Sequence, residues 1–147
     1  MILIINGPNL NLLGKREPGI YGEESFEKYL EKLRLKFPRE DIEYFQSNSE
    51  GDIINAIHKG GYDSGCKGII INPGAYSHYS LAIADAFSSV PVPIVEVHIS
   101  NIHSREEYRR HSVTAEKATG VIAGLGLHGY EAALFYLLPQ RLESLTV

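Results

Sequence analysis

The chain of 147 residues has a single cysteine, no long apolar run and fewer basic than acidic residues. The lone Cys66 excludes a disulfide framework within the chain and suits a reducing cytoplasm. No apolar run approaches the roughly 20 residues that span a bilayer, and Ile2 to Ile5 is too short for the apolar region of a signal peptide. The net charge of -4 gives no general attraction to nucleic-acid phosphates. We therefore expect a cytoplasmic protein with no membrane or nucleic-acid partner.

Short apolar runs alternate with helical patterns along the chain, which predicts a parallel sheet covered by helices. The length and the 44% hydrophobic content predict one domain over residues 1–147, with no linker or repeat. The predicted strands are Ile2 to Ile5, Asp41 to Gln46, Gly68 to Ile71, Pro93 to Val97 and Thr119 to Ala123. The second of these is the least regular and is expected at an edge of the sheet.

Apolar residues at helical spacing predict helices between the strands. The first follows Ser25 as its N-cap and ends near Pro38. Further helices are predicted behind Ser49, over Leu81 to Phe87, behind Ser104 in a capping-box pattern with Glu107, and from about Gly129 to Leu138. Five strands with right-handed crossovers favour a flavodoxin-like, doubly wound α/β fold, with helices on both faces and strand order 2-1-3-4-5.

Polar segments follow three neighbouring strands of this predicted sheet. They are Asn6 to Asn9, Asn72 to His78 and Glu96 to Asn101. In doubly wound sheets, ligands bind beyond the carboxyl ends of the strands, close to the switch point between strands 1 and 3. The three segments therefore predict one ligand site at that edge.

The segment Asn6 to Tyr21 contains three asparagines, two prolines and three glycines, so it cannot continue as a strand or form a regular helix. Loops of this length in compact domains are usually lids or binding loops. One interpretation is a gating loop that carries Arg16 and Tyr21 over a site floored by Asn9; the other is a surface loop with an ordinary salt bridge and a packed tyrosine. Tyr21 could act as a base only if a guanidinium favours its phenolate, and Arg16, with Arg105 as a second candidate, would supply it.

Glu96 and His98 flank Val97 in a strand, so their side chains share one face of the sheet. The carboxylate could then orient the imidazole for general acid or base catalysis. The alternative is a histidine at a strand end that bonds a backbone carbonyl. Convergence with the other polar segments favours the first interpretation.

The turn Ile99 to Asn101 could bind a carboxylate with its backbone N–H groups, with Arg109 as a further donor, or it could be an ordinary loop. No metal is expected, because His98, His103 and His111 have no ligand-motif spacing. The run Gly124 to Gly129 matches a dinucleotide motif, but it follows the last strand, so close packing of helix on sheet explains it better.

Six blocks of the sequence resemble type II 3-dehydroquinase in the right order along nearly the whole chain. They begin at Asn6 (Asn-Gly-Pro-Asn-Leu-Asn-Leu-Leu-Gly), Arg16 (Arg-Glu-Pro, then Tyr21-Gly22), Asn72 (Asn-Pro-Gly-Ala-Tyr), Glu96 (Glu-Val-His-Ile-Ser-Asn-Ile-His), Arg105 (Arg-Glu-Glu-Tyr-Arg-Arg-His-Ser) and Thr119 (Thr-Gly-Val-Ile-Ala-Gly-Leu-Gly). The resemblance implies dehydration of 3-dehydroquinate to 3-dehydroshikimate in the shikimate pathway, by anti elimination through an enolate and without a cofactor.

The resemblance also implies roles for individual residues. Tyr21 matches the family's base, Arg16 the lid arginine that supports it, and Asn9 the residue that holds a water against the enolate oxygen. His98 matches the acid that protonates the departing hydroxyl, and Glu96 the carboxylate that orients it.

For the substrate, Asn72, His78 and Arg109 match contacts to ring hydroxyls, and Ile99 with Ser100 matches the carboxylate-binding turn. Asp85 matches a residue that a neighbouring subunit contributes, which implies a dodecamer built as a tetramer of trimers. The chain departs from the family pattern at Ser77, Tyr79 and Ala84, which affects the surroundings of His78 and the trimer contact rather than the reaction.

Two alternatives of other classes stay open at this point. A flavodoxin-like module that binds a nucleotide or a phosphorylated metabolite would use the fold and the run Gly124 to Gly129. A scaffold whose loops serve oligomer contacts would leave Arg16, Tyr21, Glu96 and His98 without a purpose.

Overall fold

The computed structural model describes residues 1–15, 19 and 23–138 of the chain. Its sheet has five parallel strands in the order β2-β1-β3-β4-β5. The strands are β1 (Ile2–Asn6), β2 (Ile42–Gln46), β3 (Gly68–Asn72), β4 (Ile94–His98) and β5 (Gly120–Ala123). The predicted strand order and the edge position of β2 are therefore confirmed.

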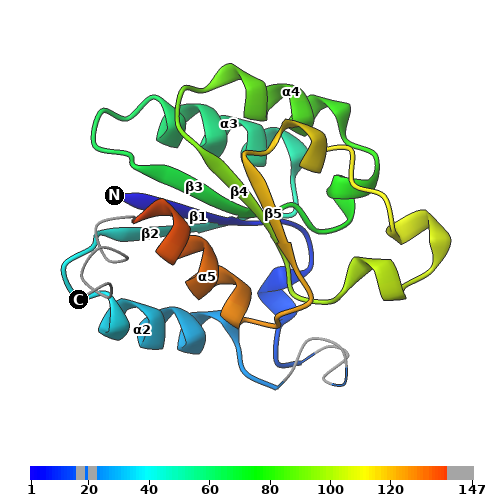
Figure 1. Cartoon of the computed structure of the whole chain (residues 1–147), viewed down its shortest axis with the longest axis horizontal. Helices are drawn as coiled ribbons and strands as arrows, with labels where there is room; N and C mark the ends of the chain where they lie inside the picture. The colour runs from blue at the N-terminus through cyan, green and yellow to red at the C-terminus, as the bar shows by residue number, and fades with distance from the viewer. Residues whose placement is uncertain (16–18, 20–22, 139–147) are drawn as a thin grey trace, which may run out of the picture.

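Helices cover both faces of the sheet. They are α2 (Phe26–Lys36), α3 (Glu50–Gly61), α4 (Leu81–Ser89) and α5 (His128–Leu137). In Figure 1, α3 and α4 lie on one face of the sheet, and α2 and α5 lie on the other. This three-layer arrangement is the predicted doubly wound α/β fold.

The inner strands β1 and β3 read as continuous apolar runs because both of their faces are buried. In β1, Ile2 and Ile4 point to the core shared with α2 and α5, whereas Leu3 and Ile5 point to the core shared with α3 and α4. Each such burial contributes about 1.5–3 kcal/mol. A strand buried on both sides cannot alternate between apolar and polar residues, and β1 does not.

Serine hydroxyls define where three helices begin. Ser25, Ser49 and Ser80 precede α2, α3 and α4, and each accepts a hydrogen bond from the backbone N–H three residues later. Such caps stabilise a helix by about 1 kcal/mol each. The predicted starts behind Ser25 and Ser49 are confirmed.

Two local predictions were wrong. Strands β1 and β3 each run one residue further than expected, because the polar side chains of Asn6 and Asn72 do not prevent their backbones from pairing with each other in register. The helix predicted behind Ser104 is absent from the described residues, and two 3-10 turns, η3 (Ile102–Ser104) and η4 (Glu107–Arg109), occupy this region. Ser104 ends the first turn instead of capping a helix, because Asn101 Oδ1 takes the capping role and accepts from His103 N at 3.1 Å.

The glycines between β5 and α5, and the one in the first turn of α5, have structural reasons to be glycine. Gly124 and Gly126 have φ angles of +88° and +60°, in the left-handed region that L side chains rarely adopt. A Cβ on Gly129 would lie 3.1 Å from Val97 Cγ1, so α5 approaches the sheet closely there. This matches the packing explanation of the motif rather than the dinucleotide one.

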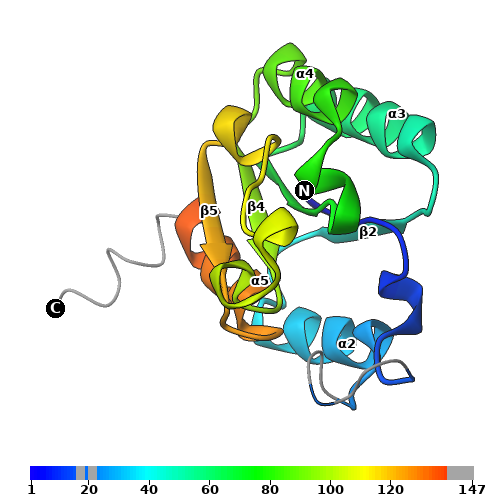
Figure 2. The same cartoon turned by 90° about the vertical axis from the view of Figure 1, so that its right-hand side faces the viewer.

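The segments that follow β1, β3 and β4 gather at one end of the sheet, to the right in Figure 1 and facing the viewer in Figure 2. They contain the 3-10 turns η1 (Leu10–Leu12) and η2 (Gly74–His78) and the turn η3. None of the helices in the described part of the chain is both long and apolar enough to cross a membrane.

Candidate active site

A cavity of about 260 Å³ opens at the carboxyl ends of β1, β3 and β4. It lies where the strand order reverses, which is the position that a doubly wound sheet favours for ligands. Candidate residues from all three polar segments line it, namely Asn9, Asn72, His78, His98, Ile99 and Ser100, together with Arg105 and Arg109 from further along the chain. Other lining residues include Leu10, Leu12, Leu13 and Ile102, which supply an apolar wall.

His98 ends β4 and is paired with Glu96 of the same strand. The two side chains share the sheet face of Ile94, as the spacing of two residues predicts. His98 Nε2 lies 2.5 Å from Glu96 Oε1, and Glu96 is fully buried behind the imidazole rather than lining the cavity. Since the carboxylate can only accept, Nε2 carries the proton of this bond, and Nδ1 is the ring nitrogen left for a ligand.

Glu96 has two further partners that the sequence reasoning missed. Ser112 Oγ donates to Glu96 Oε1 at 2.6 Å, and Thr114 Oγ1 donates to Glu96 Oε2 at 2.7 Å. Both hydroxyls are buried, and both belong to an irregular segment far along the chain from β4. A Ser-x-Thr triplet is not a recognised sequence motif for a catalytic role. The role of Ser112 and Thr114 therefore becomes visible only through their contacts in the structure.

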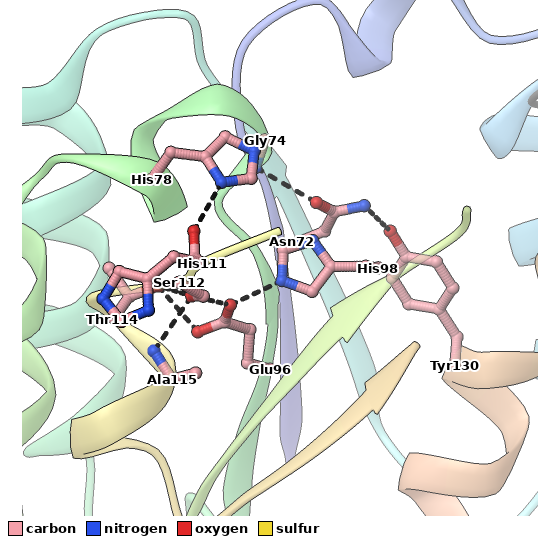
Figure 3. Close-up of polar contacts among 10 residues, drawn as sticks. All are labelled: Asn72, Gly74, His78, Glu96, His98, His111, Ser112, Thr114, Ala115 and Tyr130. Carbon is pink, nitrogen blue, oxygen red and sulfur yellow. Dashed lines mark hydrogen bonds and ion pairs between the residues drawn. The ribbon is translucent and has the colours of Figure 1, made fainter. Parts of the chain in front are cut away.

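The second histidine of the cavity, His78, ends η2 and is held by the same irregular segment. Its Nδ1 lies 2.8 Å from the backbone oxygen of His111, as Figure 3 shows. Because a carbonyl only accepts, Nδ1 carries the proton of this bond and Nε2 remains for a ligand. The Val113 N–H also donates to the Ser77 oxygen at 2.8 Å, which fixes the segment against η2.

Asn72 lines the cavity with an amide that is fixed from two sides. Its Oδ1 accepts from Gly74 N at 3.0 Å, and its Nδ2 donates to the Tyr130 hydroxyl at 3.3 Å. Tyr130, in α5, donates in turn to Asn6 Oδ1 at 2.7 Å. Since an amide nitrogen has two N–H groups, Asn72 keeps one for a ligand. The sequence reasoning also missed Tyr130, whose place in an apolar helix face resembles an ordinary core residue.

Asn9 lies at the other wall of the cavity, at the start of η1. Its φ of +69° is the one positive value of a non-glycine residue among the described residues. Its backbone N–H donates to Asn48 Oδ1 at 3.1 Å, and Gln46 Nε2 donates to the same oxygen. Asparagine tolerates the left-handed region better than most residues, so this backbone holds Asn9 in place at small cost.

Positive charge reaches the cavity through Arg105 and Arg109. Arg109 Nε lies 3.1 Å from Glu106 Oε2, and its guanidinium lies 5.3 Å from the centroid of the Tyr108 ring. The adjacent turn of Ile99 and Ser100 also lines the cavity. An anionic group of a ligand fits this wall, which combines guanidinium groups with a polar turn.

Besides the buried Glu96, three candidate residues are not placed in the cavity. Arg16 and Tyr21 lie outside the described residues. Asp85 lies on the exposed surface of α4 and does not line the cavity of its own chain. The described residues contain no group of three histidine, cysteine, aspartate or glutamate side chains placed to hold a metal ion.

The comparisons with known proteins agree with one another. The family model described as dehydroquinase class II matches residues 1–138. A 3-dehydroquinate dehydratase of Clostridium botulinum is 55% identical over 139 residues, covering 93% of each chain. One of Thermotoga petrophila is 52% identical over 147 residues, covering 99% of each. The crystal structure of a type II dehydroquinase from Butyrivibrio crossotus has a TM-score of 0.88 and 49% identity, covering 92% of this chain and 95% of that one.

Proposed function

The chain belongs to the type II dehydroquinase family, and from this membership we infer that it dehydrates 3-dehydroquinate to 3-dehydroshikimate. The protein is then a hydro-lyase of the shikimate pathway that works without a Schiff base. Consistently, no lysine is among the described residues that line the cavity.

The observation that carries the proposal is the pair of histidines in the cavity, each with one ring nitrogen fixed. His98 is bound by Glu96, and His78 by the His111 carbonyl. Loss of a hydroxyl from the substrate requires a proton donor at a defined position, and a histidine with one nitrogen fixed by a carboxylate meets that need. We assign this role to Nδ1 of His98, with Glu96 stabilising the positive charge of the donor.

The other half of the reaction removes a proton beside the ketone and forms an enolate. We propose Tyr21 as the base and Arg16 as the cation that favours its phenolate, on the sequence resemblance. Asn9 would hold a water against the enolate oxygen, which lowers the energy of the charge that develops there. An anti elimination places this base and the acid His98 on opposite sides of the ring.

For substrate binding, we propose that Asn72, His78 and Arg109 contact the ring hydroxyls and that Ile99 and Ser100 hold the carboxylate. All of these residues line the cavity, which supports the assignment. Arg105 is a supporting cation beside the same cavity.

Asp85 is proposed to act on a neighbouring subunit, because it is exposed and lies away from the cavity of its own chain. The expected assembly is a dodecamer, a tetramer of trimers, in which residues 1–147 form one catalytic domain, and the expected compartment is the cytoplasm.

The alternative, a module that binds a nucleotide or phosphorylated metabolite, has lost its main support, because backbone geometry and close packing explain Gly124 to Gly129.

The direct test is to mix the purified protein with 3-dehydroquinate and to follow the conjugated enone of the product by its ultraviolet absorbance. Turnover that survives borohydride in the presence of substrate supports the enolate route. Folded protein that gives no enone would contradict the proposed function, and inactivation by borohydride would indicate an imine and contradict the mechanism.

The role of Tyr21 has its own test. Because general base catalysis is worth roughly 10²–10⁴-fold, Tyr21→Phe is expected to lower kcat by that order while substrate binding, measured by calorimetry, is largely kept. The matched control is Tyr136→Phe, at an exposed position of α5. A variant that binds poorly but keeps its rate would show that Tyr21 is not the base.

A further inference from the structure

The segment of residues 111–114 contacts His78 directly and contacts Glu96, the partner of His98, as Figure 3 shows. It bonds His78 through the His111 oxygen, and it bonds the partner of His98 through Ser112 and Thr114. The segment lies between the 3-10 turns η4 and η5 (Ala115–Lys117), so no regular ladder fixes its backbone. The hydrogen bonds of Ser112 and Thr114 to Glu96 therefore hold this segment against β4.

The two hydroxyl protons of this segment both point to Glu96. The Ala115 N–H donates to Ser112 Oγ at 3.1 Å, which occupies an acceptor site of Ser112 and leaves its proton for Glu96 Oε1. Thr114 Oγ1 lies 3.1 Å from Ser112 Oγ but only 2.7 Å from Glu96 Oε2, so its better acceptor is the carboxylate. Each oxygen of Glu96 thus receives a hydroxyl donor.

With His98 Nε2 as the third donor, Glu96 accepts three hydrogen bonds and is fully buried. A carboxylate only accepts hydrogen bonds. The neutral acid would carry an O–H of its own, and that O–H would face His98, Ser112 or Thr114, each of which already acts as a donor to Glu96. The arrangement therefore fits the ionised form, since hydrogen bonds to a charged group favour that form. An ionised Glu96 stabilises the charge that His98 must carry before it gives up a proton.

We propose that Ser112 and Thr114 are positioning residues for the general acid His98. They hold Glu96 ionised and fix its plane, so that His98 keeps its proton on Nε2 toward Glu96 and presents Nδ1 to the departing hydroxyl. The inference rests on the proposed function, because it assigns the two hydroxyls a place in that reaction. It does not require either residue to touch the substrate.

The first experiment compares Ser112→Ala and Thr114→Val with the wild-type enzyme. Each removes one hydrogen bond to a buried charge, so kcat is expected to fall roughly 10- to 100-fold. KM is expected to stay within about twofold, because neither side chain belongs to the substrate-binding set. Thr114→Ser keeps the hydroxyl and is expected to recover kcat to within about threefold of wild type.

Two controls separate positioning from loss of local structure. Thr119→Val removes a hydroxyl that accepts from Ile94 N at the start of the same strand, so it should lower the Tm without lowering kcat. Ser77→Ala removes a buried hydroxyl that has no hydrogen-bond partner among the described residues, so it should leave kcat unchanged and should not lower the Tm. A fall in kcat of Thr119→Val equal to that of Thr114→Val would overturn the proposal, as would wild-type kcat in both Ser112→Ala and Thr114→Val.

Coupling to Glu96 gives a sharper measurement. If Ser112 acts only through Glu96, then adding Ser112→Ala to Glu96→Gln should lower kcat by less than about twofold further. Independent, multiplicative losses would contradict the proposal.

A substrate-free measurement keeps this inference distinct from the proposed function. Nitrogen-15 NMR of the His98 ring should show the proton on Nε2 in the wild type and a mixture of tautomers in the Ser112→Ala, Thr114→Val double variant. Identical ring signals in the two proteins would overturn the positioning role. Wild-type protein that does not convert 3-dehydroquinate would contradict the proposed function alone.

Discussion

At the scale of single residues, Tyr130 links the helix α5 to the end of the sheet that carries the cavity. Its hydroxyl donates to Asn6 and accepts from Asn72, and the side chain is fully buried. Burial raises the pKa of Tyr130 well above its ordinary value, so the hydroxyl keeps its proton and remains a donor. A buried phenol with two amide partners thus fixes two asparagines that face each other in register on β1 and β3.

Tyr130→Phe tests this link. The change leaves Asn6 Oδ1 without its 2.7 Å donor at a fully buried position, so the free energy of unfolding is expected to fall by about 1–3 kcal/mol. Urea denaturation measures it, with Tyr136→Phe on the exposed side of the same helix expected within about 0.5 kcal/mol of wild type. Equal losses in the two variants would show that the Tyr130 hydroxyl does not carry this stability.

The same residues show how far the sequence could predict the site. The pairing of Glu96 with His98 was predictable, because two residues at spacing two in a strand must share a face. The hydroxyls of Ser112 and Thr114 were not, because they reach Glu96 from an irregular segment whose path depends on tertiary contacts. Tyr130 was hidden for another reason: its ring packs in the core beside Phe26, and only its hydroxyl serves the site.

At the scale of elements, the loops after β1 and β3 meet at Gly7. The Gly7 N–H donates to the Asn72 oxygen at 2.8 Å, and a Cβ on Gly7 would lie 2.5 Å from the Pro73 oxygen. The obstacle is backbone, which cannot rotate away as a side chain can. The loop after β1 carries Asn9 to the cavity, and the loop after β3 begins directly at Asn72, so the close contact of the two loops sets part of the cavity's shape.

Gly7→Ala should therefore separate the loops. We expect a loss of about 1–3 kcal/mol of stability from overpacking, together with a lower kcat/KM because Asn9 and Asn72 move apart. Urea denaturation and the enone assay measure the two effects. Gly120→Ala is the matched control, since a Cβ at Gly120 meets nothing within 4 Å, and it should leave kcat/KM unchanged. A fully active, stable Gly7→Ala protein would contradict the close-contact argument.

Tyrosines from α2, β2 and α5 pack together around Phe26. Burial raises the pKa of Tyr29 and of Tyr44 to about 12 each, so the folded protein holds their protons more tightly than the unfolded chain, whose tyrosines titrate near pH 10. Stability from this source is complete below pH 10 and is lost as the pH rises from 10 toward 12.

Urea denaturation between pH 8 and pH 11.5 should show this loss as a falling free energy of unfolding above pH 10. Tyr44→Phe should make the fall shallower, because the variant has one fewer buried phenol to ionise. An unchanged slope would mean that Tyr44 ionises equally easily in both states.

Element boundaries reveal a limit of sequence reasoning at this scale. Apolar runs located the inner strands β1 and β3 because burial on both faces leaves a continuous signal. The helix predicted at Ser104 failed because a capping pattern describes only local bonds. Asn101 caps the preceding turn η3, and its backbone oxygen already accepts from the Ser104 N–H. Local sequence patterns predicted the secondary structure correctly where the tertiary packing stabilised the same element.

At the scale of the whole molecule, the sheet order alone brought the three polar segments together. That order followed from right-handed crossovers and was predictable, whereas the contact of one chain with another was not visible in any periodicity. Asp85 is an example, because its proposed role depends on such a contact between chains. It is exposed on α4 and away from its own cavity, so a role in catalysis requires a second chain.

Subunit complementation tests that requirement. Asp85→Asn and His98→Ala are each expected to be nearly inactive, because the first lacks the residue that its neighbour needs and the second lacks the acid of its own cavity. In mixed trimers of the proposed assembly, a subunit with Asp85→Asn retains His98 and can receive Asp85 from a His98→Ala neighbour. With equal amounts and random assembly around a closed ring, about one quarter of all sites should then be complete.

The enone assay on the co-expressed variants should thus give about one quarter of the wild-type rate per chain, far above either variant alone. Mass measurement of the mixture checks that both chains enter one assembly. If Asp85 served its own cavity, no site in the mixture would hold both Asp85 and His98, and mixing would restore nothing. A mixture as inactive as its components would therefore contradict the inter-subunit role, because only a neighbour's Asp85 can complete a site in this experiment.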